Sequence, residues 1–110
     1  MAQIEIDAWK ALDVLPSTAN TLKSGGVIPS EAKEWFGAGL VEPKSIFEWR
    51  KSGFSPEQAG RWVSAGLEDP DDAEDWAEES FFPSEAKEWL DADFSLREAV
   101  KNRAKGLRPI

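Results

Sequence analysis

Carboxylates are the side chains whose number and spacing could do chemistry in this chain of 110 residues. Aspartate and glutamate number 21 against 13 lysines and arginines, so the net charge is −8. Two carboxylates at a fixed separation across a cleft can hydrolyse glycosides, but a short-helix chain of this size offers little room for a deep pocket. The segment 69–72 lacks the glycine and the ligand spacing of an EF-hand loop, so we predict no metal site.

Other catalytic groups are scarce. The chain has no cysteine and no histidine, which removes thiolate nucleophiles, the commonest general base and the commonest transition-metal ligand. The sequences 30–33 and 84–87 match the Ser-x-x-Lys nucleophile motif of penicillin-binding enzymes, but the companion motifs are absent and both copies arise from an internal repeat. We therefore predict a protein that is not an enzyme and has no cofactor.

The acids cluster in one part of the chain, because residues 68–79 hold eight acids and no base. A run of like charges is usually a solvated helix face, with acids favoured near the helix N-terminus. The competing interpretation is a docking surface, where complementary charge speeds the encounter with a basic protein. We favour docking and expect the contacts to come from the acids of this region and two phenylalanines. These residues are Glu68, Asp69, Asp71, Asp72, Glu74, Asp75, Glu78, Glu79, Phe81, Phe82, Glu85, Glu88, Asp91 and Asp93.

The acidic balance also bears on the class of partner. It argues against direct nucleic-acid binding and favours a protein partner with a basic surface. The alternative function is a small acidic inhibitor of the phage anti-defence type, which would mimic nucleic acid and block the basic groove of a nucleic-acid-processing enzyme. A basic tail speaks against that alternative, because residues 97–108 hold five bases and one acid. The tail could pair with the acids of the same chain or of a second copy, so self-association is a further alternative.

Sequence features also bear on the cellular location. No apolar run approaches the roughly 20 residues that span a bilayer. Residues 1–10 lack a basic region followed by an apolar core, so no secretory signal is visible. We therefore expect a cytoplasmic protein without a membrane contact.

An internal repeat of 13 or 14 residues must position these groups. Five tryptophans are spaced by 14, 13, 14 and 13 residues, and a proline precedes each by six: Trp35, Trp49, Trp62, Trp76 and Trp89. The heptapeptide PSEAKEW at 29–35 recurs unchanged at 83–89. In the unit 55–67, serine and glutamine three residues apart predict a capping box, proline suits the first helical position, and glycine predicts the helix end. Residues 95 and 98 repeat the capping pattern.

These signals predict an all-α fold, an α-solenoid or compact superhelix of about seven to eight helices of ~10 residues each. Alanine and tryptophan at helical spacing predict that the five tryptophans form the core. We expect one helical-repeat domain over residues 1–110, with divergent units at 1–27, regular repeats at 28–94 and a capping unit at 95–110.

From residue 28 to residue 107 the units resemble the Pro-x-Glu-Ala-x-x-Trp-x-x-Ala-Gly-Phe helical repeats of various uncharacterised, mostly bacterial, proteins. The units SPEQAGRWVSAGL and FPSEAKEWLDADF carry the resemblance. It implies a repeat type and transfers no activity or site residue. The unit 68–81 departs from the pattern, since Glu79 and Ser80 replace the usual small residue and glycine.

Overall fold

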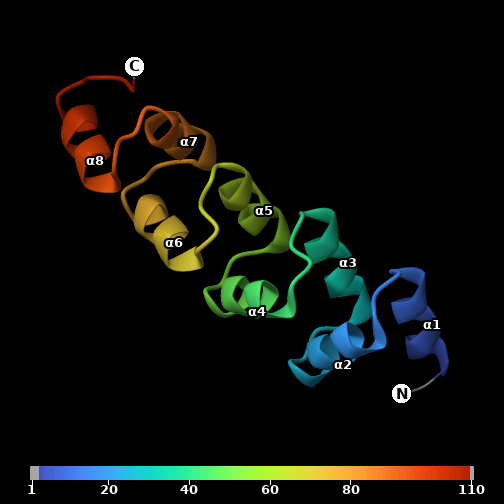
Figure 1. Cartoon of the computed structure of the whole chain (residues 1–110). Coiled ribbons are helices and arrows are strands. Elements are labelled where there is room, and N and C mark those ends of the chain that lie inside the picture. The colour runs from blue at the N-terminus through green and yellow to red at the C-terminus, as the bar shows by residue number, and fades with distance from the viewer. Residues whose placement is uncertain (1–2, 110) are drawn as a thin grey trace. The chain divides into compact units, whose positions relative to one another are not determined.

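The computed structural model describes residues 3–109, and all regular secondary structure in this range is helical (Figure 1). Eight helices of nine residues each lie within it, so the predicted all-α fold of short repeated helices is confirmed. The helices are α1 (Gln3–Ala11), α2 (Pro16–Ser24), α3 (Pro29–Gly37), α4 (Pro43–Lys51), α5 (Pro56–Ser64), α6 (Pro70–Glu78), α7 (Pro83–Asp91) and α8 (Leu96–Ala104). None of these helices has the length and apolar character needed to cross a bilayer.

The helices gather into two compact units, and each is described by itself. Unit 1 ends at Gly60 and unit 2 begins at Arg61. In unit 1 alternate helices contact each other, α1 with α3 and α2 with α4 (Figure 1). A close approach of α5 to the end of α3 needs a glycine, because a Cβ at Gly60 would lie 2.9 Å from the Cβ of Ala38. The single repeat domain expected from the sequence stays a prediction.

Local capping explains where the helices begin. Proline occupies the start of α2 to α7, where its missing N–H would have no intrahelical partner. Both predicted capping boxes are confirmed. The Gln58 amide N–H donates to Ser55 Oγ at 3.1 Å while the Ser55 N–H donates to Gln58 Oε1 at 3.0 Å. Ser95 and Glu98 exchange the same two hydrogen bonds, each at 3.2 Å.

Each helix from α2 to α8 ends in the same type of turn, in which one residue takes the left-handed conformation and the next N–H bonds back into the helix. In α2, α3, α4, α5 and α8 that residue is the predicted glycine. In α6 it is Ser80, with φ 64°, and in α7 it is Asp93, with φ 66°. The α6 end therefore keeps the repeat geometry despite its departure in sequence, and the Phe81 N–H donates to the Trp76 carbonyl at 3.2 Å.

Tryptophans and alanines make up most of the core. All five tryptophans of the repeat are buried, with exposed fractions of 5% or less. The alanine three residues before Trp35 and the one before Trp89 are fully buried, as small residues must be where helices approach closely. Because the tryptophans are enclosed in this way, the carboxylates are left on the outer faces of the helices.

Candidate functional site

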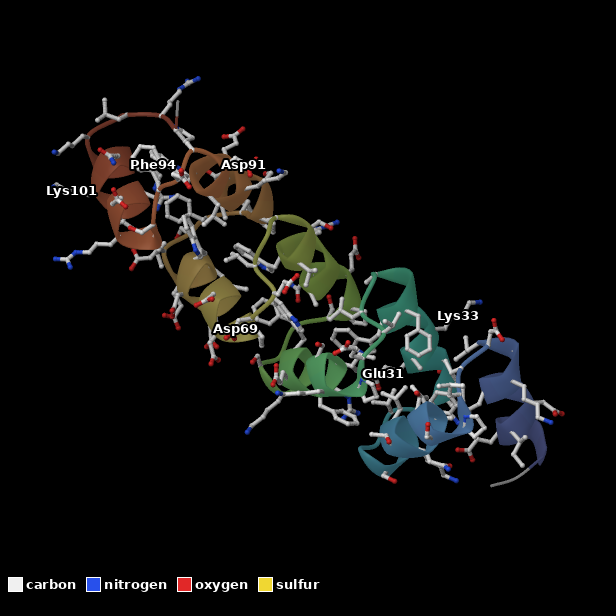
Figure 2. The ribbon with its side chains drawn as sticks, in the orientation of Figure 1. Glu31, Lys33, Asp69, Asp91, Phe94 and Lys101 are labelled. Atoms are coloured by element: carbon white, nitrogen blue, oxygen red, sulfur yellow. The ribbon has the colours of Figure 1, made fainter. Side chains whose placement is uncertain are left out.

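The acidic surface is formed by the carboxylates of residues 68–93, which lie on α6, on α7 and in the turns beside them. Figure 2 shows Asp69 at the start of α6 and Asp91 at the end of α7. Eleven of the twelve acids predicted for the site are exposed, and Glu85 is half-buried. The structure therefore places the predicted acids where a partner could reach them.

Few of these carboxylates have a partner in the chain. Asp91 accepts a hydrogen bond from Lys87 Nζ at 2.8 Å, in an exposed pair within α7. Asp69 caps α6 by accepting from the Asp71 N–H at 2.9 Å, and Glu85 accepts from the Phe82 N–H at 3.0 Å. Lys87 is a base that forms an ion pair with the acidic surface, through Asp91. The surface therefore presents largely uncompensated negative charge.

The acids are spread over the helix faces. Over the described range no group of three or more potential ligands has an arrangement that could hold a metal ion. Such a distribution suits long-range attraction of a cationic surface rather than chelation.

The two phenylalanines at the end of α6 lie in different environments. Phe81 is 3% exposed, and its ring packs edge-to-face on Trp76 with centroids 4.9 Å apart. The guanidinium of Arg103 lies over the same ring, 3.8 Å from its centroid. Phe82 is 72% exposed. Phe81 is therefore enclosed by the fold, and Phe82 is the aromatic side chain at this turn that a partner could contact.

Arg103 has a role that composition did not reveal, because by sequence it was one of five bases in the tail. It donates through Nη1 to the Ser80 carbonyl at 3.3 Å and through Nη2 to the Glu79 carbonyl. The four other bases, Arg97, Lys101, Lys105 and Arg108, are exposed and form no ion pair with the acidic surface within the described range. Lys101 lies on the outer side of α8 (Figure 2).

A corresponding arginine in unit 1 provides the signal that could have identified Arg103. Arg50 donates through Nη1 to the Gly25 carbonyl and through Nη2 to the Gly26 carbonyl, both at 3.2 Å. Each arginine directly follows the register position of the repeated tryptophan and reaches the end of the helix two repeats earlier. An alignment of the repeats by their helices places Arg50 and Arg103 at the same repeat position, whereas a count of charges does not reveal this.

The Ser-x-x-Lys sequences show no nucleophile geometry. Ser30, Lys33 and Ser84 are exposed, and the Lys87 ammonium is engaged with Asp91. No hydrogen bond joins serine and lysine of either copy among the residues described. Activation of a serine needs a base within hydrogen-bond reach, and this arrangement does not supply one.

Comparison with protein-family models, with curated proteins and with solved structures gives no match for this chain.

Proposed function

We propose that the chain is a non-enzymatic protein-binding module that acts in the cytoplasm and docks a partner bearing a basic surface. The acidic surface on α6 and α7 makes the contact, and Phe82 serves as its apolar anchor. Direct binding of nucleic acid and contact with a membrane are not part of this function.

The observation that carries the proposal is the excess of exposed carboxylate over base on α6 and α7. Like charges this close repel each other and destabilise the isolated chain, while a basic partner relieves the repulsion. Uncompensated charge of one sign raises the rate of encounter with a surface of the opposite sign. An exposed aromatic ring beside it is the kind of side chain that dominates interface energetics.

The test compares two triple variants with the same change in net charge. The first, Asp72→Asn, Glu74→Gln and Glu78→Gln, neutralises exposed acids of α6. The second, Glu34→Gln, Glu42→Gln and Glu48→Gln, neutralises three exposed acids of unit 1 and serves as the control. Each tagged protein is used to capture partners from a lysate of the source organism, and the captured protein is then titrated by surface plasmon resonance.

We expect the α6 variant to lose about threefold or more in association rate and to show a weaker dependence on salt, since surface charge acts chiefly on encounter. The control variant should keep the rate of the unaltered chain. Equal rates for all three proteins at low salt would show that the acidic surface is not the contact.

The inhibitor alternative has its own readout in the same experiment. If the captured partner is a nucleic-acid-processing enzyme, added DNA or RNA should compete with the chain, with steep salt sensitivity. A partner that does not bind nucleic acid leaves the general docking function in place and excludes the inhibitor.

A further inference from the structure

Three helices of the repeat end in the same aromatic arrangement. After α4, α6 and α7 a phenylalanine folds back against the tryptophan of its own helix, with ring centroids 4.9–5.1 Å apart and interplanar angles of 70–88°. The pairs are Trp49–Phe54, Trp76–Phe81 and Trp89–Phe94. Each ring follows directly on the residue in the left-handed conformation, so its position relative to the last helical carbonyls is the same.

One of these helix ends holds a guanidinium. At the end of α6, Arg103 lies over the Phe81 ring and donates to the carbonyls of Ser80 and of the preceding residue. The corresponding carbonyls at the end of α2 also bind a guanidinium, that of Arg50, although valine follows them instead of phenylalanine. The end of a repeat helix is therefore an arrangement that binds arginine, as the ends of α2 and α6 show.

The end of α7 has the same arrangement without an arginine. Asp93 occupies the left-handed position with φ 66°, and the carbonyls of Ala92 and Asp93 accept no side-chain hydrogen bond from residues 3–109. No cationic side chain of that range lies over the Phe94 ring, which is half-buried, whereas the Phe81 ring beneath Arg103 is 3% exposed. Figure 2 labels Phe94 between α7 and α8, and Asp91 on α7.

We infer that the end of α7, formed by the carbonyls of Ala92 and Asp93, the ring of Phe94 and the carboxylate of Asp93, binds an arginine side chain of a basic partner. This inference rests on the proposed function, because it names the side chain that the partner inserts. A guanidinium suits the site better than an ammonium, since its planar fork meets two adjacent carbonyls while its face stacks on the ring.

The end of α4 provides an internal control with the same ring and the opposite charge. Phe54 repeats the edge-to-face contact, but the residues at the positions of Asp91 and Asp93 are Lys51 and Gly53. A lysine and a glycine at these two positions supply no carboxylate to attract a guanidinium, and the lysine charge repels it. The inference therefore assigns the arginine to α7 and not to α4.

The experiment titrates the full chain with N-acetyl-arginine amide and, separately, with N-acetyl-lysine amide, and follows backbone amide shifts by NMR. Two variants alter the site. Each replaces one residue by the residue that other repeats carry at the same position. Phe94→Leu removes the ring, as in the units that end in Leu40 and Leu67, and Asp93→Gly removes the carboxylate, as in the units that end in glycine. Phe54→Leu makes the matched change at the end of α4.

We expect the arginine probe to shift the amides of residues 92–94, and the lysine probe to bind more weakly. Phe94→Leu and Asp93→Gly should each raise the dissociation constant of the arginine probe about two- to fivefold, the range expected for one cation–ring or surface-charge contact. Phe54→Leu should leave it unchanged. Equal binding of the two probes, or an unchanged dissociation constant in Phe94→Leu, would overturn the inference.

The small probe keeps this result separate from the proposed function. A chain that binds the arginine probe at α7, yet captures its partner equally well after neutralisation of α6, retains the arginine site and loses the docking function. A chain that needs its α6 acids for capture but does not bind the probe retains the function and loses the arginine site.

Discussion

Arg50 in unit 1 and Arg103 in unit 2 cap helix ends in the same way but differ in the group that supports the guanidinium. Arg50 Nε donates to Glu31 Oε2 at 2.8 Å, and the Trp35 indole N–H donates to the same oxygen at 3.0 Å. Arg103 instead lies on the ring of Phe81. We call each arginine, with the carbonyls it binds and the group that supports it, a clamp. The Arg50 clamp uses a carboxylate, and the Arg103 clamp uses an aromatic face.

The difference shows where each unit places its negative charge. In unit 1 the Glu31 carboxylate is engaged by a cation and by an indole from two helices. Glu85 holds the same position in unit 2, and its carboxylate accepts instead from the Phe82 N–H. Because Phe81 supports Arg103, no carboxylate of the acidic surface is neutralised by it. Residues 1–60 hold eight acids and six bases, whereas residues 61–110 hold 13 acids and seven bases.

The largest effect should come from the two tryptophans of the identical heptapeptides. Trp35→Ala and Trp89→Ala should each lower the free energy of unfolding by about 3–5 kcal/mol, the usual cost of removing a large aromatic side chain from a core. Replacement of each tryptophan by phenylalanine should distinguish the two positions by their loss of stability. Trp35→Phe loses the hydrogen bond to Glu31 and should cost about 1 kcal/mol more than Trp89→Phe, whose indole forms no hydrogen bond in the described range. Urea unfolding followed by circular dichroism measures all four variants, and equal costs for both Trp→Phe changes would contradict the comparison.

A smaller effect is expected from the two clamps. Arg50→Gln and Arg103→Gln should each lower the free energy of unfolding by about 1–2 kcal/mol. The effect of Arg50→Gln is smaller than the loss of a buried ion pair, because the Arg50–Glu31 pair is partly exposed. The cost of Arg50→Gln should fall by roughly half when sodium chloride is raised to about 1 M, since salt screens its ion pair with Glu31. The cost of Arg103→Gln should change less, because its partners are carbonyls and a ring. Identical salt dependence of the two unfolding free energies would show that the clamps do not differ in kind.

The smallest effect concerns the turns that the two arginines cap. Ser80 in unit 2 holds a left-handed conformation that glycine holds at residue 26 in unit 1. Ser80→Gly should raise the free energy of unfolding by about 1 kcal/mol or less, because relief of strain outweighs the added entropy of the unfolded chain. Gly26→Ser should lower it by a similar amount. Thermal unfolding of both variants gives the comparison, and a loss of stability in Ser80→Gly would refute it.

Much of the candidate site could be predicted from the sequence. The clustering of acids is visible in the sequence itself, and an acidic side chain can be expected on the surface without knowledge of its tertiary contacts. The positions of the helices follow equally from local signals such as Ser55 with Gln58 and the glycine at residue 66. The different environments of Phe81 and Phe82 follow from the repeat register, because Phe81 directly follows the left-handed residue, as the buried Leu40 and Leu67 do. The guanidinium of Arg103 over the Phe81 ring could not be predicted, because Arg103 comes from another helix.

The short helices and their tryptophan core follow from the amino-acid sequence, because the prolines at helix starts, the glycines at helix ends and the spacing of alanine and tryptophan all act within a single repeat. Which charged side chains are engaged and which are left exposed depends on the packing of helices against one another. Arg50 and Arg103 each reach the end of a helix two repeats earlier, and the group that supports each guanidinium, Glu31 on α3 or Phe81 after α6, depends on packing that no single repeat contains.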